Sequence, residues 1–388
     1  MSELQHPAPS LPPQLAELPD LSDLTAQLEQ SLFAVHTSVE TYVDGETMDA
    51  QDDDECPWHE PFPDWEGPIL QILDWKAAER ASANRIARAT SQELRRLTQL
   101  MDLLRARGNY RKLACVPPDW RTRLETLEVQ FPNFGEVIDY LRRTYALATL
   151  GDSTPRLAPL LLLGPPGIGK SLFADQLARQ LGSTLVTLRM ENAQTNSMLT
   201  GSAEYWGNTR SGEVLNTLLE NDFANPVFLL DEIDKTPEGE HDPLNSLYTL
   251  WEPTTAKSFT DLSYPWLAVD ASRILWICTA NDASVLPDPL LDRLRCFDVP
   301  PPTAGQTRKM VQSIYANLLA ELPAAVSGLK LTPKAVELLI GLSPRRIRQV
   351  LEEAMGQAVY EGRKRIIARD ISLDDAEPMA KPSMGFLP

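Results

Sequence analysis

The eight residues GPPGIGKS, Gly164 to Ser171, combine glycines with a lysine and a hydroxyl at a spacing that suits phosphate binding. Glycines let the backbone N–H groups of such a loop turn inward around an anion, and the N-terminus of a following helix favours negative charge. Lys170 would reach the outer phosphates of a nucleotide, and the hydroxyl of Ser171 would hold Mg²⁺. A glycine-rich turn without a ligand is the alternative, which the complete motif between an apolar run and a helical pattern disfavours.

Two carboxylates, Asp231 and Glu232, follow the apolar run VFLL. Ligands of open parallel sheets bind at the carboxyl ends of the strands, so we expect this pair beside the glycine-rich loop. Asp231 would hold Mg²⁺, directly or through water, and Glu232 would polarise the water that attacks the γ-phosphate. A solvated loop is the other common explanation of an acidic pair after a strand, but the loop upstream favours catalysis.

Four further polar residues could complete such a site. Asn281 ends the apolar run ICTA, and its amide could position the attacking water or contact the γ-phosphate. Arg293, in PDPLLDRLR, could neutralise the charge of phosphoryl transfer, also in a neighbouring subunit, although by itself it is typical of a protein surface. Arg345 and Arg346 lie near the start of a late helical pattern.

Alternating helix and strand patterns surround these residues and must position them. Buried strands are predicted at the runs APLLLLG, STLVTLRM, NPVFLLD and SRILWICTAN, and helices are expected over 170–181 and 213–220. The alternation predicts an α/β domain over 118–301, with a parallel sheet covered by helices on both faces. Beyond this domain the strand patterns stop, and we expect a helical domain over 302–375 and a tail over 376–388.

The charge of the chain is concentrated near its N-terminus. The net charge is −18, and residues 1–75 hold 17 acidic residues and no lysine or arginine. We expect residues 1–67, which are acidic and rich in proline, to form a largely disordered arm that docks, inhibits or only solubilises. Residues 68–117 have helical spacing and, from Lys76 to Lys112, ten bases against three acids. This basic helical region would recruit partners or make oligomer contacts, and nucleic-acid binding is the less favoured alternative.

The composition disfavours several classes of protein. No run approaches the ~18 apolar residues that a membrane span needs, and the opening segment MSELQHPAPS lacks the features of a secretory signal. The four cysteines and four histidines have no zinc-ligand spacing. We therefore expect a cytoplasmic protein with reduced thiols and no membrane contact.

Five segments resemble, in order and spacing, the ATPase module of the Lon protease family within the AAA+ ATPases: GPPGIGKS, NPVFLLDEIDK, LYTLWEPTTAKSFTDLSYPWLAVD, TAND and PLLDR. The resemblance runs from about residue 159 to residue 369. It implies an AAA+ P-loop NTPase module with a C-terminal helical lid and ATP hydrolysis with ATP and Mg²⁺ as cofactors. It also implies a homo-oligomeric ring, usually a hexamer.

The resemblance further implies a role for each residue of the site. The glycine-rich loop looks like Walker A, Asp231 and Glu232 look like Walker B, and Asn281 looks like sensor 1. Arg293 looks like an arginine finger that acts on a neighbour, and Arg345 looks like sensor 2 on the lid, a role that the next residue could also fill. The nucleotide would be bound by Gly164, Pro165, Pro166, Gly167, Ile168, Gly169, Lys170, Ser171, Leu172, Asp231 and Arg345.

An unusual pair of aromatic residues lies in the segment GSAEYWGNTRSG, Gly201 to Gly212, where a buried helix or strand would have apolar neighbours. Lon-like rings carry an aromatic–hydrophobic–glycine loop here, which lines the central pore. The resemblance implies that Tyr205 and Trp206 grip an extended polypeptide, that Gly207 lets the loop turn, and that TTAKSFTDLSYPW forms a second pore loop. Packing of both rings under a surface loop is the alternative.

The sequence departs from Lon in two ways. The Ser–Lys protease domain that follows the lid in Lon is missing, and only 19 residues follow Arg369, so we expect no intrinsic protease activity. The N-terminal substrate domain of Lon is not recognisable, so the substrate cannot be carried over. We favour an AAA+ ATPase that remodels, unfolds or disassembles protein partners through a ring pore, as a chaperone or unfoldase. A nucleic-acid motor or loader and a nucleotide-dependent assembly switch are the alternatives.

Overall fold

The computed structural model describes residues 62, 64–192, 197–202, 209–237, 242–322 and 328–373. All of them belong to the second of the two units into which the chain divides, Trp58–Pro388. Most of the expected acidic arm, and all of the tail expected over 376–388, lie outside the described residues. Within the described ranges, none of the helices has both the length and the apolar character that a membrane crossing requires.

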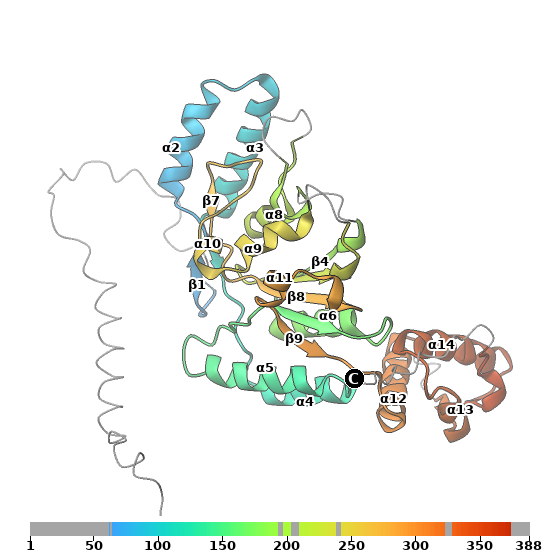
Figure 1. Cartoon of the computed structure of the whole chain (residues 1–388). Coiled ribbons are helices and arrows are strands. Elements are labelled where there is room, and N and C mark those ends of the chain that lie inside the picture. The colour runs from blue at the N-terminus through green and yellow to red at the C-terminus, as the bar shows by residue number, and fades with distance from the viewer. Residues whose placement is uncertain are drawn as a thin grey trace, which may run out of the picture. The chain divides into compact units, whose positions relative to one another are not determined.

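Five parallel strands form the central sheet, in the order β4-β5-β8-β3-β9 (Figure 1). Their bounds are β3 Leu160–Leu163, β4 Leu185–Arg189, β5 Val227–Asp231, β8 Leu275–Ala280 and β9 Arg295–Asp298. β3, β5 and β8 occupy the middle of the sheet, and their sequences are almost wholly apolar because both faces of the sheet are covered. The predicted α/β fold with a parallel sheet is confirmed.

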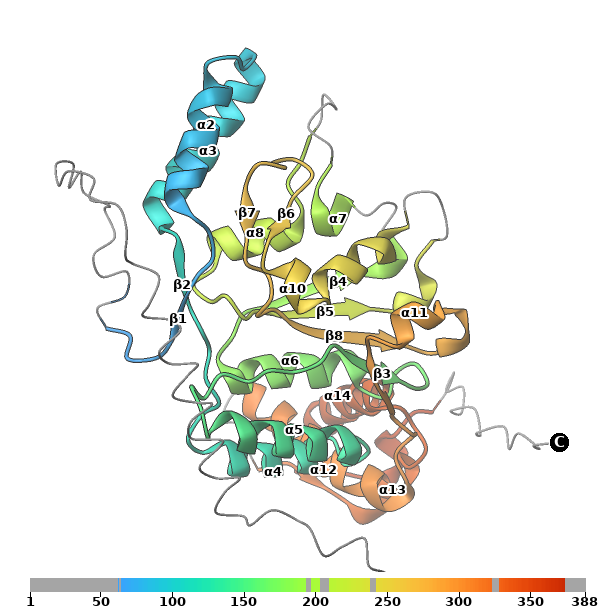
Figure 2. The ribbon, with the colours of Figure 1, turned by 60° about the vertical axis from the view of Figure 1, so that its left-hand side comes forward.

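Helices cover both faces of this sheet (Figure 2). The helices of the α/β layers are α4 Trp120–Gln130, α5 Gly135–Ala148, α6 Lys170–Leu181, α7 Ser197–Thr200, α8 Glu213–Glu220, α9 Leu247–Leu250, α10 Pro253–Ala256 and α11 Asp288–Leu291. Successive side chains of a strand point to opposite faces, so Leu160 and Leu162 of β3 pack with α4, α5 and α6. Leu161 between them joins the opposite cluster, which includes α8 and α9.

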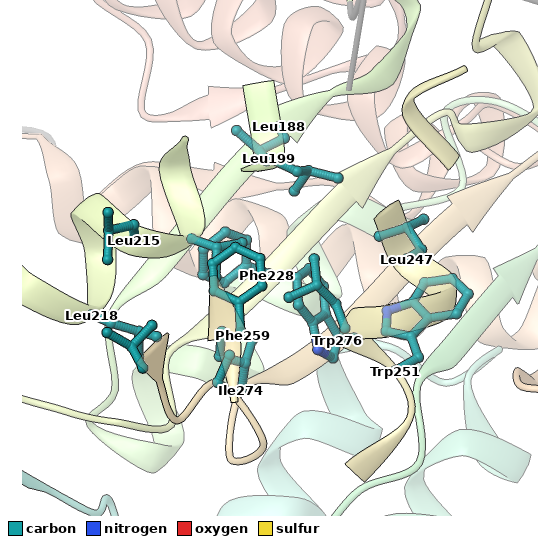
Figure 3. Packing of buried hydrophobic residues seen from close by; sticks show 14 of the residues in the cluster. Leu188, Leu199, Leu215, Leu218, Phe228, Leu247, Trp251, Phe259, Ile274 and Trp276 are labelled. Carbon is teal, nitrogen blue, oxygen red and sulfur yellow. The ribbon is translucent and has the colours of Figure 1, made fainter. Parts of the chain in front are cut away.

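Aromatic rings occupy the middle of that opposite cluster (Figure 3). Phe228 of β5 and Trp276 of β8 are buried, and their ring centroids lie 5.0 Å apart. Leu215 and Leu218 of α8 and Leu247 of α9 belong to the same cluster. This packing fixes α8 and α9 on the sheet. It thereby fixes the positions from which the segments flanking these helices start.

A helical hairpin precedes the sheet in the chain. Its elements are β1 Ile69–Gln71, α2 Trp75–Ile86, α3 Ser91–Arg107 and β2 Tyr110–Lys112. Thr90 and Glu93 form a capping box that starts α3, and the antiparallel pairing of β1 with β2 closes the hairpin at its base. Leu100, Met101 and Leu104 of α3 belong to the same hydrophobic cluster as Phe228 of the sheet. The basic region expected over 68–117 is thus packed onto the α/β layers.

The buried side chain of Arg111 ties this hairpin to α8. Arg111 is 1% exposed; its Nε donates to the carbonyl oxygen of Leu218 at 2.8 Å, and its Nη2 to that of Leu219 at 2.7 Å. Nη1 donates to the carbonyl oxygen of Gly108 at 2.9 Å. Carbonyls in the last turn of a helix lack helical partners. A cation at this end also interacts favourably with the helix dipole. Burial lowers the pKa of Arg111 to about 10, which leaves the guanidinium charged near neutral pH.

A third hydrophobic cluster holds the C-terminal helical domain together. The elements are α12 Ala304–Glu321, β10 Lys330–Leu331, α13 Pro333–Leu338, α14 Pro344–Tyr360 and β11 Arg365–Ile366. β10 and β11 form a short parallel pair, so strands do recur after residue 301, contrary to the sequence-based expectation. Two other short strands, β6 Phe259–Thr260 and β7 Ala268–Val269, pair antiparallel and form a hairpin that projects from the sheet layers.

Replacing Arg111 by methionine should lower the free energy of unfolding by about 2–4 kcal/mol, because backbone carbonyls that cannot be removed would lose a buried donor. Arg105→Met is the matched control, since Arg105 is an exposed arginine of the same hairpin that pairs with Asp102. The control should cost no more than about 0.5 kcal/mol. Urea unfolding followed by circular dichroism measures both, and equal losses in the two variants would contradict the bracing role of Arg111.

Candidate nucleotide-binding site

The glycine-rich loop joins the end of β3 to the start of α6. Gly169 is the N-cap of α6 and has a left-handed backbone with a φ of 101°, which only glycine adopts at little cost. A Cβ atom on Gly164 would collide with the backbone carbonyl of Val299. The loop conformation therefore requires glycine at both positions. It leaves the first backbone N–H groups of α6 without helical partners, which suits a bound anion.

The ammonium of Lys170 lies inside this loop. Its Nζ donates to the carbonyl oxygens of Gly164 at 2.5 Å and Pro165 at 3.0 Å, and to Oδ1 of Asn281 at 3.0 Å. Burial lowers the pKa of Lys170, and the carboxylate of Asp234 with others nearby opposes that change. The side chain is thus held at the carboxyl edge of the sheet, where a phosphate group would compete for its protons.

Asp231 accepts hydrogen bonds from two hydroxyls. Ser171 donates through Oγ to Oδ1 of Asp231 at 2.8 Å, and Thr279 donates through Oγ1 to the same oxygen at 2.6 Å. Hydroxyl and carboxylate oxygens are hard donors of the type that Mg²⁺ prefers in nucleotide sites. The residues that the sequence assigned to Mg²⁺, Ser171 and Asp231, therefore lie together and fit this ion chemically.

Glu232 has a strained backbone and a charged partner. Its φ is 57°, in the left-handed region that residues other than glycine rarely adopt, and its N–H donates to Oγ1 of Thr279 at 2.9 Å. Oε2 of Glu232 lies 2.8 Å from Nζ of Lys235. The carboxylate of the expected catalytic base is therefore held by a neighbouring ammonium in this conformation.

The carboxylate of Asp234 fixes the end of β8. Its Oδ2 accepts the backbone N–H of Asn281 at 2.9 Å and that of Asp282 at 3.1 Å. These bonds hold Asn281 in the orientation in which its side-chain oxygen reaches Lys170.

Sequence reasoning missed Asp234, Lys235 and Thr279. Thr279 is the informative case, because it is a polar residue at 1% exposure inside the apolar run of β8. Thr279 lies two positions before Asn281, so both side chains point to the same side of the strand. The two-residue period of a strand could therefore have identified Thr279 as a site residue. Asp234 and Lys235 gave no comparable signal, since charged residues after a strand are ordinary loop residues.

A pocket of about 620 Å³ lies between the glycine-rich loop and the C-terminal helical domain. The predicted nucleotide-binding residues that line it are Pro166, Gly167, Gly169, Lys170, Ser171, Leu172, Asp231 and Arg345. Three others do not line it: Gly164 packs under Val299, Pro165 offers its carbonyl to Lys170, and Ile168 is buried in the core. These three shape the loop instead. Glu232 and Asn281 also line the pocket, with Thr279.

The two candidate sensor arginines occupy different places at the start of α14. Arg345 lines the pocket, whereas Arg346 does not. The backbone N–H of Arg346 caps the helix start by donating to Oγ of Ser343 at 3.3 Å. Arg348 also lines the pocket, but its guanidinium is paired with Glu321. Arg345 is therefore the arginine of this helix that is best placed to meet a nucleotide.

Arg293 is not brought to the pocket of its own chain. The residue is exposed, its Nη1 donates to the carbonyl oxygen of Pro289 at 2.7 Å, and its guanidinium lies 5.3 Å from the ring centroid of Tyr248. The predicted pore residues are Tyr205, Trp206 and Gly207, and they lie outside the described residues.

The parallel sheet, the glycine-rich loop before α6 and the acidic end of β5 together define a P-loop nucleotide-binding domain. Residues 160–301 match the family model of the ATPase family associated with various cellular activities (AAA). The chain therefore carries an AAA ATPase domain, and its Lon-like character, predicted from the sequence, is confirmed by the relatives below.

Curated relatives of this chain include several Lon proteases. The Lon protease of Halothermothrix orenii is 31% identical over 219 residues, which cover 56% of this chain and 27% of the relative. Lon protease 1 of Bacillus subtilis is 28% identical, with 56% of this chain and 29% of the relative covered. A mitochondrial Lon protease homolog of Emericella nidulans is 27% identical over 77% of this chain and 28% of its own length. The chain thus spans less than a third of these relatives.

Replacing Thr279 by valine should lower the rate constant of ATP hydrolysis by about 10–100-fold, because the acceptor of the Glu232 N–H and a donor to Asp231 are lost without a change of shape. Nucleotide affinity, which rests on other groups, should change less than about threefold. Thr187→Val on β4 is the control, because that threonine is exposed on the same sheet. Steady-state ATPase assays decide, and equal rates for the two variants would contradict the positioning role of Thr279.

Proposed function

We propose that this chain is an ATP-driven remodelling protein, which hydrolyses ATP in a ring and uses the cycle to unfold or disassemble protein partners. One observation supports it most: Lys170 and Asp231 from the α/β domain line the same pocket as Arg345 from the helical domain. Hydrolysis or release of a phosphate would therefore alter contacts with both domains at once. Such a change can drive a hinge motion between the two domains. The two predicted pore loops would carry that movement to a polypeptide.

In this mechanism each residue has a distinct task. Lys170 binds and orients the phosphates, and Ser171 with Asp231 would hold Mg²⁺, which neutralises charge during phosphoryl transfer. Glu232 takes up the role of base once its carboxylate leaves Lys235 and can polarise a water. Asn281 positions that water. No covalent step on the protein is needed, because positioning and charge stabilisation account for this reaction.

Arg293 would act on the neighbouring subunit of a homo-oligomeric ring, which we expect to be a hexamer. Its guanidinium is exposed and yet held by Pro289 and Tyr248, so it is oriented before any neighbour arrives. A fixed planar cation suits the developing charge of a phosphoryl group. Hydrolysis in one subunit would then depend on its contact with the next subunit, so ATP hydrolysis would be coordinated around the ring.

The nucleic-acid alternative relies on the ten bases between Lys76 and Lys112. Three of them make contacts within the chain: Arg111 is buried, Arg107 forms an exposed pair with Asp222, and Arg96 donates to the carbonyl oxygen of Thr209. These contacts weaken the basic surface that nucleic acid would need, so protein remodelling remains our proposal. The proposal concerns the AAA domain over 160–301 and does not include peptide-bond hydrolysis. A cytoplasmic location stays a prediction.

Glu232→Gln should bind ATP, lower hydrolysis by at least about 100-fold, and hold whatever the ring engages. The variant would be purified with ATP from its native cells, and co-purifying molecules identified by mass spectrometry and nuclease digestion. Lys170→Ala, which should bind ATP poorly, is the control. A protein enriched only with Glu232→Gln supports remodelling. Enriched nucleic acid, or recovery of neither, contradicts it in favour of a motor or an assembly switch.

Mixing two inactive variants tests the role of Arg293. Arg293→Ala keeps its own Glu232, and Glu232→Gln keeps its own Arg293, so a mixed ring contains interfaces with both groups intact. We expect mixing to restore ATPase activity to about a quarter of wild type if every such interface works. Glu232→Gln mixed with Lys170→Ala is the control. Glu232 and Lys170 serve the same pocket of a single subunit, so every subunit of this mixture has a defective pocket and no recovery is expected. No recovery with Arg293→Ala would contradict action across the interface.

A further inference from the structure

Hydrogen bonds join the ends of the segment that holds the predicted pore residues to a hairpin that contains most of the predicted second pore loop. We define the first loop as residues 201–212 and the second loop as the β6–β7 hairpin, residues 259–269, which overlaps the second pore loop predicted over 254–266. The backbone N–H of Leu262 donates to the carbonyl oxygen of Thr200 at 2.8 Å, which joins the hairpin to the foot of the first loop. In Figure 2 the hairpin stands beside α7 and α8, the helices on either side of the first loop.

The carboxylate of Asp261 lies at this junction and is fully buried, with 0% exposure. Its Oδ2 accepts the backbone N–H of Gly212 at 2.8 Å, across the gap between the two loops. Its Oδ1 accepts both the N–H and the hydroxyl of Ser263, at 2.9 Å and 2.6 Å, inside the second loop. One oxygen thus serves each loop.

The other foot of the first loop is shaped around the same carboxylate. Gly201 has a φ of 75°, and a Cβ atom on it would collide with the carboxylate of Asp261. Both feet of the first loop, Gly201 and Gly212, therefore contact one side chain of the second loop. Burial raises the pKa of Asp261, and the bonds from Ser263 and Gly212 oppose that change. A buried carboxylate that keeps all its partners makes a stiff joint, because separation of the loops would leave its Oδ2 buried without the Gly212 donor.

We propose that Asp261 is a positioning residue that locks the two pore loops together, so that they move as one unit when the ring pulls on a polypeptide. The inference rests on the proposed function for its mechanical meaning, but the contact between the loops stands on its own geometry. If the bond between Asp261 and Gly212 is removed, the two loops can move independently. Part of the ATP hydrolysed would then produce no movement of the polypeptide. The chain's efficiency, measured as ATP hydrolysed per polypeptide remodelled, is the quantity that Asp261 would set.

Asp261→Asn separates the two halves of the joint. The amide oxygen can still accept from Ser263 and keep the local turn, but the NH₂ group would face the Gly212 N–H as donor against donor. Asp270→Asn is the matched control. Asp270 makes the same local turn, accepting the N–H and hydroxyl of Ser272 at 2.8 Å and 2.6 Å, in the segment that follows the hairpin.

Hydrogen exchange followed by mass spectrometry measures the joint directly. In Asp261→Asn, we expect the amides of Gly201 and Gly212 to exchange at least about tenfold faster than in wild type, while Asp270→Asn changes them less than about twofold. The working readout uses a fluorescent, permanently unfolded polypeptide as probe, with ATP consumption and probe movement measured together. We expect Asp261→Asn to consume at least about fivefold more ATP per probe moved.

Two results would overturn the proposal: unchanged exchange at Gly201 and Gly212, or faster exchange with an unchanged ATP cost. If Asp261→Asn fails to fold, Gly201→Ala cuts the same joint from the first loop, with Gly182→Ala as the control because Gly182 has a similar φ of 65° in open space. Tyr205→Ala distinguishes the two levels of inference. Full probe movement by that variant overturns the proposed function and the mechanical role of Asp261 with it, while the exchange rates still report on the contact.

Discussion

The parallel register of β3, β5 and β8 places the chemistry of this protein at one edge of the sheet. Leu163 pairs with Ala280, and Leu230 pairs with Cys278, so the three strands reach their carboxyl ends side by side. The residues that follow them are a phosphate loop, two carboxylates and an amide. These groups meet because the long-range pairing of parallel strands aligns the carboxyl ends of the strands. Thr279 and Asp234 then supply the short-range bonds that fix their orientation.

The hairpin of α2 and α3 contacts the segments that support both loops. Arg111 binds the last carbonyls of α8, and Arg96 reaches the carbonyl oxygen of Thr209, at the foot of the first loop. The guanidinium of Arg85 lies 5.3 Å from the ring of Trp266 in the second loop. A partner that bound the outer face of this hairpin would therefore press on the supports of both loops, and close packing transmits such displacements.

The fold and the core of the site were accessible from sequence for a physical reason. Phosphate and Mg²⁺ chemistry restricts residue types and spacing so tightly that Gly164–Ser171 and Asp231 stand out from any background. β9 was missed because RCFD, an edge strand, carries charged residues and lacks an apolar run. Arg345 could not be separated from Arg346, because neighbours on a helix face directions about 100° apart and only the packing of the helix decides which meets the pocket.

Basic composition did not indicate which bases of the hairpin are buried. Six of the ten bases between Lys76 and Lys112 are exposed, yet Arg111 is buried among backbone carbonyls, where it satisfies acceptors that no sequence pattern marks. Contacts between segments far apart in sequence have the same character: nothing in the residues around Asp261 indicates that Gly212 is its partner. Such bonds depend on where the sheet places each loop, and they become visible only after folding.

The connection between the two ends of β8 suggests how the site and the loops communicate. β7 ends at Val269 and β8 begins at Leu275, so the second loop runs into the strand whose other end carries Thr279 and Asn281. β8 is buried along its whole length, and a buried central strand shifts as a unit because its neighbours interdigitate with it. In the proposed function, a displacement of Asn281 on hydrolysis would thus reach the second loop along one strand. The carboxylate of Asp261 would pass it to the first loop, whose described ends also join α7 and α8 and contact Arg96 of α3.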